Sequence, residues 1–186
     1  LLLKNISTVV SCDDCDTVYE GVDIYIKSGK IERIGKNLQC EADTVIDCSC
    51  MICYPGLINT HHHLYQYFSR NIKSVQNFEL FDWLRALYGV WKNLDEDAVY
   101  LSSMCGMAEL LKSGCTTCFD HHYVFPNAVS SRLLDAQYSA HNDLGIRMYI
   151  SRGSMNLSEK DGGLPPDSVV QTTDEIMKES IDAIKK

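Results

Sequence analysis

Apolar and polar residues alternate along the first fifty positions of the chain. The alternation is clearest over residues 22–26, a Ser-Gly turn follows at 28–29, and residues 31–34 resume the pattern. Residues 45–48 form one more short apolar run. A period of two is typical of half-buried β-strands, and turn residues between such runs indicate a β meander. We therefore expect residues 1–50 to form a small β segment that is too thin to be stable alone.

The pattern changes at residue 51. Residues 51–60 are a mainly apolar run, containing Pro55-Gly56, that leads directly into His61-His62-His63. Two further short apolar runs lie at 115–120 and 146–151. Each run has the length of a buried strand and is bounded by turn residues. We expect three strands at these positions.

Helical spacing of apolar residues follows each of the three strands. The first helix is expected to start at a capping box in which Asn93 is the N-cap and Glu96 the third helical residue. Its apolar residues recur at helical spacing: Leu101, Met104, Cys105, Ala108 and Leu111. The second helix is expected to open at Pro126 and to end at Gly145, and the third to start at Thr173.

Strands and helices therefore alternate from residue 51 onward. This order is typical of parallel βαβ units, so the sequence predicts an α/β fold. Residues 64–92 form a long insertion after the first strand, and residues 81–91 within it are expected to be helical. We predict two domains, a β segment over residues 1–50 and strand–helix units over residues 51–186.

Composition is that of an ordinary globular protein. The 186 residues are 45% hydrophobic and 23% charged, with a net charge of −8 and a pI near 5.1. No basic stripe with interleaved aromatic residues is present, so nucleic acid is not an expected partner. No window approaches the roughly 18 apolar residues of a membrane span, and no signal peptide is recognisable. We expect a cytoplasmic protein without a membrane partner, and the first residue, Leu1, suggests that the natural N-terminus lies further upstream.

Nine cysteines are present, which is a high and odd number. An odd count without a secretory signal argues against a disulfide framework and favours a reducing compartment. The pairs Cys12/Cys15 and Cys50/Cys53 could supply a four-thiolate zinc site, but the gap between them exceeds the usual 15–20 residues. Most of the cysteines are better explained as small buried hydrophobic residues.

His61 and His63 are the residues that point most directly to chemistry. Side chains two positions apart on a strand point to the same side, so both imidazoles can reach one metal ion. His62 between them is expected to point elsewhere. In a parallel barrel, functional groups lie at the C-terminal ends of strands, which is where this triplet falls. The pair therefore predicts one part of a metal site.

The sequence around this pair resembles the amidohydrolase superfamily. The match is closest to its branch of aminohydrolases acting on purines, pterins and triazines, and within that branch to the 8-oxoguanine deaminase and hydroxyatrazine-type enzymes. The motif that carries the resemblance is Pro55-Gly56-Leu57-Ile58-Asn59-Thr60-His61-His62-His63. Supporting stretches are residues 63–66, 113–117, 120–126 and 152–155.

The resemblance implies a fold, a cofactor and an activity. The fold is the N-terminal part of a (β/α)₈ TIM-type barrel preceded by a small β-sandwich segment. The cofactor is one divalent metal, zinc or iron, which activates a water for attack on a ring carbon bearing an amino group. The activity is hydrolytic deamination of a heterocycle such as the oxopurine 8-oxoguanine, and the parent enzyme is expected to be a homo-oligomer.

The resemblance also implies site residues beyond this sequence. Two further ligand histidines, a late aspartate and an acid/base glutamate belong to later strands of the family, and no matching motif follows here. A complete barrel needs about 250 residues. We therefore expect the catalytic residues beyond Lys186, weak metal binding by the pair, and no activity of this chain alone.

Three residues are candidates for substrate contact. Gln66 matches a glutamine that contacts substrate in several family members, and a carboxamide can bind the amide edge of a heterocycle. An ordinary loop glutamine is the alternative. Arg152 ends the third strand and is expected to face the active site, although an ion pair with an acidic neighbour would also explain it. One of His121 and His122, at the end of the second strand, is expected to line the pocket, and we select His122; a polar residue at the rim is the alternative.

Other readings remain open from the sequence. Asp120-His121-His122 resembles the motif of manganese-dependent DHH phosphoesterases, although the upstream aspartate cluster of those proteins is missing. A non-enzymatic zinc module built from cysteines and histidines is a second alternative. Within the amidohydrolase interpretation, dechlorination of a triazine is an alternative to deamination.

Overall fold

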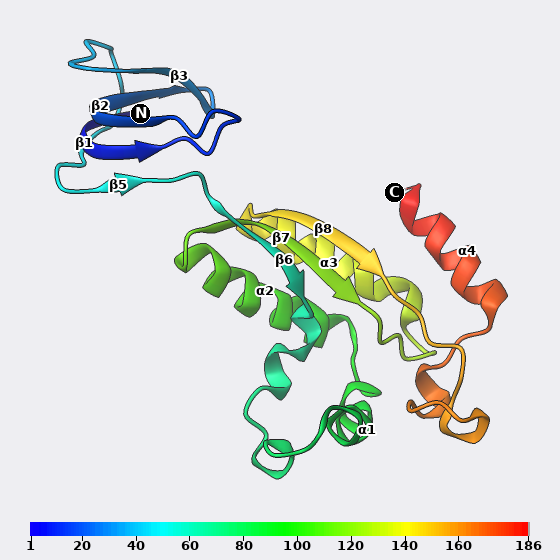
Figure 1. Cartoon of the computed structure of the whole chain (residues 1–186). Helices are drawn as coiled ribbons and strands as arrows, with labels where there is room; N and C mark the ends of the chain where they lie inside the picture. The colour runs from blue at the N-terminus through cyan, green and yellow to red at the C-terminus, as the bar shows by residue number, and fades with distance from the viewer. Residues whose placement is uncertain (186) are drawn as a thin grey trace. The chain divides into compact units, whose positions relative to one another are not determined.

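The computed structural model describes residues 1–185 and divides into two compact units, Leu1–Gly56 and a second unit from Leu57 onward. The strands and helices of both are labelled in Figure 1. Each unit is described by itself.

The first unit is a five-stranded sheet. Its strand order is β3-β2-β1-β4, and β5 also pairs with β1. The β2–β3 hairpin turns at Ser28 and Gly29, which both have positive φ (50° and 74°), as a tight two-residue hairpin requires. The strands are β1 (Leu2–Val10), β2 (Val18–Lys27), β3 (Lys30–Gly35), β4 (Val45–Asp47) and β5 (Ile52–Cys53).

The alternation of apolar residues in this unit builds its core. The hydrophobic cluster at its centre consists of Ile6, Val9, Val22, Ile24 and Cys48. The continuous strand expected over residues 51–60 is wrong, because β5 ends at Cys53 and a new strand begins at Leu57. Pro55 lacks the N–H that a ladder needs, so the chain leaves one sheet before it enters the next.

The second unit contains three parallel strands in the order β6-β7-β8. Their bounds are β6 (Leu57–His62), β7 (Cys115–His122) and β8 (Arg147–Arg152). The connections are the helices α2 (Glu96–Lys112) and α3 (Ser130–Leu144), which pack on each other along one face of the sheet (Figure 1). The expected series of parallel strand–helix units is confirmed.

Two more helices belong to this unit. The helix α1 (Leu80–Trp91) lies in the insertion after β6, close to the expected residues 81–91. The helix α4 (Thr173–Ile184) begins at the expected position, and Thr172 and Glu175 form a reciprocal capping box at its N-terminus. Short 3₁₀ turns occur at Leu64–Ser69, Lys73–Val75, Glu159–Asp161 and Asp167–Val169.

The predicted starts of α2 and α3 are wrong by a few residues. Asp95 caps α2, because its Oδ1 accepts from the Ala98 N–H at 2.8 Å. Asn93 instead donates its amide to the carbonyls of Gly89 and Val90 at the end of α1. The helix α3 starts at Ser130 rather than at Pro126.

The predicted inward face of α2 is also displaced. Its buried residues are Val99, Ser102, Ser103, Gly106 and Met107, whereas Leu101 is 51% exposed. Small residues bring the helix close to the strand end, since a Cβ on Gly106 would lie 2.7 Å from Leu64 Cδ2. The face that α2 turns toward the strand end is therefore set by how closely its backbone can approach, and the spacing of apolar residues alone does not predict that face.

Candidate metal centre

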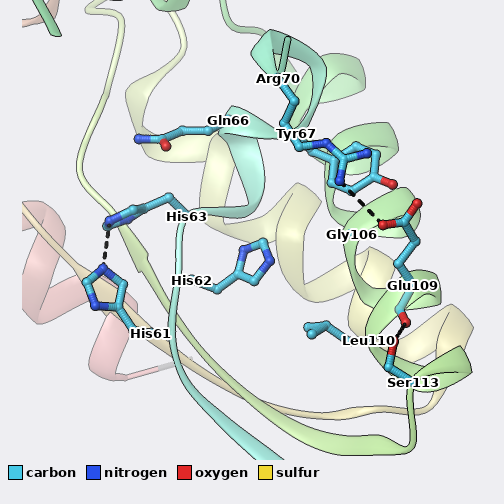
Figure 2. Close-up of a pocket in the computed structure, with 10 residues that line it drawn as sticks. All are labelled: His61, His62, His63, Gln66, Tyr67, Arg70, Gly106, Glu109, Leu110 and Ser113. Carbon is cyan, nitrogen blue, oxygen red and sulfur yellow. Dashed lines mark hydrogen bonds and ion pairs between the residues drawn. The ribbon is translucent and has the colours of Figure 1, made fainter. Parts of the chain in front are cut away.

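His61 and His63 lie at the C-terminal end of β6, where alternation along the strand brings both rings to one side. Their Nε2 atoms are 3.2 Å apart. His62 points to the other side, toward α2 (Figure 2). The predicted pairing of the two outer histidines, with His62 directed away, is present in the structure.

The geometry of this pair fits a shared metal ion. Two nitrogen ligands at about 2.0–2.1 Å from a tetrahedral zinc are about 3.3–3.4 Å apart, close to the observed separation. The Nδ1 atom of His63 lies 2.8 Å from the carbonyl oxygen of His121. A carbonyl only accepts, so His63 carries its proton on Nδ1 and keeps a lone pair on Nε2 for a metal. His61 and His63 would therefore hold the ion through Nε2.

Asp120 fixes the backbone that follows His63. This carboxylate is fully buried; one oxygen accepts from the Leu64 N–H at 2.6 Å and the other from Gln137 Nε2 at 2.7 Å. Burial raises the pKa of Asp120 to about 6. Because both oxygens are occupied inside the protein, Asp120 is not placed to bind manganese as the phosphoesterase reading requires.

His121, and not the predicted His122, is the histidine of β7 that faces His61 and His63. His122, our candidate for substrate contact, is fully buried between Tyr65 and Phe125, and its Nε2 lies 3.0 Å from the Val124 carbonyl. Burial lowers its pKa to about 4. His121 faces the His61/His63 pair instead, and its ring centroid lies 5.8 Å from that of His63.

His121 is held by its neighbours on β8 and directly after it. Its Nδ1 lies 2.9 Å from Ser151 Oγ. A Cβ on Gly153 would come within 2.9 Å of His121 Nε2, so only glycine leaves room for this ring. Burial lowers the pKa of His121. Sequence reasoning selected the wrong histidine because the side of the strand that faces the site depends on register.

Arg152 does not face the His61/His63 pair, so the prediction that its side chain points toward the active site is wrong. Successive side chains alternate along β8, and Ser151 already occupies the side toward His121. Arg152 is buried over the Phe125 ring, 4.3 Å from its centroid, and forms a 2.7 Å ion pair with Glu179 of α4. It also donates to Gln171. The alternative explanation for Arg152, an ion pair with an acidic neighbour, is what the structure contains.

Gln66 lies just beyond the His61/His63 pair, and its carboxamide is on the same side as the His63 ring (Figure 2). Its Nε2 donates to the hydroxyls of Tyr65 and Tyr123, at 3.2 and 3.0 Å. The Tyr123 ring stands edge-on to His63 with 5.2 Å between centroids. Tyr123 was not selected from the sequence, where a tyrosine after a strand carries no distinctive signal.

A hollow of about 370 Å³ opens beside the histidines, between the end of β6 and α2. Its outer wall is charged: Arg70 stacks 3.6 Å over the Tyr67 ring and pairs with Glu109 at 3.4 Å. Its lining residues are those drawn in Figure 2: His61, His62, His63, Gln66, Tyr67, Arg70, Gly106, Glu109, Leu110 and Ser113.

No larger metal-ligand cluster occurs in residues 1–185. No three His, Cys, Asp or Glu side chains lie together there in an arrangement that could hold an ion. All nine cysteines are free thiols. A thiolate-rich zinc module is therefore not built by the described residues, and the candidate centre there consists of two histidines.

None of the helices described is long and apolar enough to cross a membrane.

Known proteins resemble the chain over most of its length. It is 38% identical over 178 residues to hydroxydechloroatrazine ethylaminohydrolase from Pseudomonas sp. (strain ADP), covering 89% of this chain and 37% of that protein. It is 46% identical over 134 residues to 8-oxoguanine deaminase from Pseudomonas aeruginosa, covering 72% of this chain and 30% of that protein. The chain thus spans about a third of the length of these curated relatives.

Solved structures show the same similarity. Atrazine chlorohydrolase TrzN from Arthrobacter aurescens TC1, complexed with zinc, superposes with a TM-score of 0.90 at 32% identity, over 100% of this chain and 42% of that one. Guanine deaminase from E. coli shares the fold, with a TM-score of 0.69 at 18% identity. The barrel-type α/β fold expected from the sequence is thereby confirmed. The model of the amidohydrolase family matches residues 52–186, and the chain belongs to that family.

Proposed function

We propose that this protein is a metal-dependent hydrolytic deaminase of an amino-substituted heterocycle, with an oxopurine such as 8-oxoguanine as its substrate. The observation that carries the proposal is the 3.2 Å approach of His61 and His63 through Nε2 at a strand end. Zinc is the metal we propose, since the TrzN structure contains it and the nitrogen spacing suits a tetrahedral ion.

The described residues have distinct parts in this proposal. His61 and His63 bind the metal, which when bound supplies Lewis-acid activation of the attacking water. The carbonyl of His121 keeps the His63 proton on Nδ1, and Asp120 anchors the backbone after His63 to β7. Gln66 lies on the same side and contacts the heterocycle.

The relatives support deamination of an oxopurine and also a second candidate. The relatives named as deaminases include 8-oxoguanine deaminase and isoxanthopterin deaminase, and also deaminases named for adenosine derivatives, such as 5-methylthioadenosine/S-adenosylhomocysteine deaminase. The second candidate is hydrolysis of a substituted triazine, which is favoured by hydroxydechloroatrazine ethylaminohydrolase and by the TrzN structure. Both reactions replace a substituent on a ring carbon by a water-derived oxygen.

A chimeric enzyme tests the proposal. Residues 57–186 of this chain replace the corresponding segment of the Pseudomonas aeruginosa 8-oxoguanine deaminase, and ammonia release from 8-oxoguanine is measured after zinc loading. We expect activity, and we expect His61→Ala or His63→Ala to reduce it at least about 100-fold because each removes a metal ligand. His141→Ala, on the outer helix α3, serves as the control histidine.

A folded, zinc-loaded chimera without ammonia release would contradict the oxopurine proposal. The same segment is therefore grafted into the hydroxydechloroatrazine ethylaminohydrolase as well. Activity of only this second chimera, on the substrate of its host, would favour the triazine alternative. Inactivity of both would reject the proposed hydrolytic function.

We also propose a cytoplasmic location, supported by nine free cysteines, which suit a reducing compartment. We also predict that the parent enzyme is a homo-oligomer and that its binding partner is a small heterocyclic substrate.

A further inference from the structure

The C-terminal end of β6 is not held by a regular ladder. Its register against β7 pairs Asn59 with Cys118 and then His62 with Asp120, so β6 takes three steps where β7 takes two. One extra residue of this kind interrupts the backbone hydrogen bonds between the strands and re-aims the side chains nearby. Other groups must therefore hold the backbone at the metal-binding end of β6.

Two side-chain oxygens hold this backbone. Asn59 Oδ1 accepts from the His61 N–H at 3.1 Å, and Asp120 Oδ1 accepts from the Leu64 N–H at 2.6 Å. The second bond fixes the peptide group between His63 and Leu64. The plane of that peptide sets the ψ angle of His63, which is 79°, well away from the strand value of about 115°. The orientation of His63 therefore depends on where the Asp120 carboxylate points.

Gln137 of α3 determines where that carboxylate points. Its Nε2 donates to the second oxygen of Asp120 at 2.7 Å, and both side chains are fully buried. A carboxylate that is bonded through both oxygens cannot rotate about its side-chain torsions without breaking a hydrogen bond. A continuous series of hydrogen bonds thus runs from α3 through β7 to the peptide after His63.

The burial of Gln137 is not explained by packing. Within residues 1–185, no group pairs with its Oε1 atom, which is shielded from solvent. A buried oxygen without a partner lowers the stability of the fold, and an apolar side chain of similar size would avoid that loss. The hydrogen bond to Asp120 is therefore the contact that accounts for a glutamine at this position of α3.

We propose that Gln137 is a positioning residue of the metal centre. Through Asp120 it fixes the peptide after His63, and it thereby keeps the Nε2 atom of His63 directed toward the metal. The carbonyl of His121 fixes the other ring nitrogen, Nδ1, at 2.8 Å. This inference rests on the metal centre of the proposed function and extends that centre to a residue on an outer helix.

Gln137→Met tests the proposal, because it removes the donor and keeps an unbranched side chain of similar length. Zinc affinity is measured by competition with a chromophoric chelator, and we expect it to fall about tenfold, as when support behind a metal ligand is removed. The ring nitrogens of His63 are observed by ¹H–¹⁵N NMR on the metal-free chain at pH 8. The His63 proton, held on Nδ1 in the wild type, should become shared between both nitrogens.

Two further variants separate positioning from stability. Gln137→Asn keeps the carboxamide but shortens it by one methylene, so zinc affinity should again fall about tenfold. Leu133→Ala, at a fully buried apolar position of the same helix, is the matched control. It should lower the stability through the cavity it creates, yet leave the zinc affinity within about twofold and the His63 proton on Nδ1. Urea unfolding identifies the variants that are folded.

Wild-type zinc affinity and an unchanged His63 proton in either folded Gln137 variant would overturn the inference. A tenfold loss of zinc affinity in folded Leu133→Ala would overturn it as well, because general loosening of α3 would then be sufficient. Failure of the proposed metal centre is observed separately, as the absence of zinc binding by the wild-type chain. In that case the NMR signals of His63 in the metal-free proteins still decide whether Gln137 positions this ring.

Discussion

His121 and His122 are adjacent, yet they occupy opposite environments. His121 faces the metal pair, and His122 is fully buried behind the strand. The sequence was sufficient to place His61 and His63 on one side, because their relative orientation depends only on the period of a strand. It was insufficient to choose between His121 and His122, because that choice depends on how β7 is registered against β6 by contacts such as Asp120 to Leu64.

The burial of His122 predicts an acid-sensitive contribution to stability. Its pKa is lowered from 6.5 to about 4, so the folded state binds fewer protons than the unfolded state between these values. The contribution of His122 to the free energy of unfolding is fully present above pH 6.5. It falls by about 3 kcal/mol in total as the pH falls toward 4. In His122→Phe this loss should disappear, as measured by urea unfolding at several pH values.

The comparison is made as the difference between the two proteins at each pH. Asp120, whose pKa is raised, acts in the opposite direction in both and cancels. A difference in unfolding free energy that stays constant from pH 7 to pH 4 would show that His122 does not titrate in this way.

At the scale of elements, helix α2 is positioned by small residues. Apolar spacing predicted an inward face that includes Leu101, but Ser102, Ser103 and Gly106 are the residues that approach the strand end. The tightest contact is that of Gly106 with Leu64, the residue after His63. The pattern of apolar residues cannot predict this contact, because the contact requires that Gly106 has no side chain.

Gly106→Ala should destabilise the second unit. The new methyl would lie 2.7 Å from Leu64 Cδ2, and overpacking of this kind costs about 1–3 kcal/mol. Gly89→Ala in helix α1 is the matched control, since no atom lies within 4 Å of its added Cβ and alanine favours a helix. Thermal unfolding compares them, and equal or higher stability of Gly106→Ala would contradict the packing shown here.

Helix α4 is attached to the sheet by a partly buried ion pair. Arg152 of β8 is 6% exposed in its side chain, and it meets Glu179, which also accepts from Ser130 of α3. Arg152→Met should lower the unfolding free energy by about 3 kcal/mol, because it leaves the Glu179 charge without its partner. Amide exchange over residues 173–184 should also become faster.

The exposed pair of Arg85 and Asp82 on α1 provides the comparison. Arg85→Met there should change the unfolding free energy by no more than about 0.5 kcal/mol. A similar small effect for Arg152→Met would mean that the buried pair does not hold α4.

At the scale of the whole molecule, the order of strands and helices and the presence of two units were predicted, whereas the boundary between the units lies at Gly56 rather than at residue 50. Alternating apolar segments and helical spacing indicated parallel units from residue 51 onward, as observed. The division falls at Gly56 because β5 pairs with β1 while β6 pairs with β7. Pairing partners are a tertiary property, and an apolar run read alone does not reveal which of two sheets it joins.

The face of the three-stranded sheet that bears the histidines carries exposed aromatic side chains. Phe119 and Tyr149 are paired in register and are 41% and 64% exposed. Exposed apolar surface of this kind promotes association. We expect sedimentation velocity to show concentration-dependent association of the chain, and Phe119→Thr with Tyr149→Thr to reduce it. Equal association of both proteins would place the contact elsewhere.

Zinc competition with a chromophoric chelator tests the central claim most directly. The chain should bind one zinc ion weakly, and His61→Ala or His63→Ala should each reduce its affinity at least about tenfold. His141→Ala and the double variant Cys12→Ser with Cys15→Ser should leave the affinity within about twofold. Zinc binding that survives both metal-site substitutions, or that is lost in the cysteine variant, would contradict a metal centre built on His61 and His63.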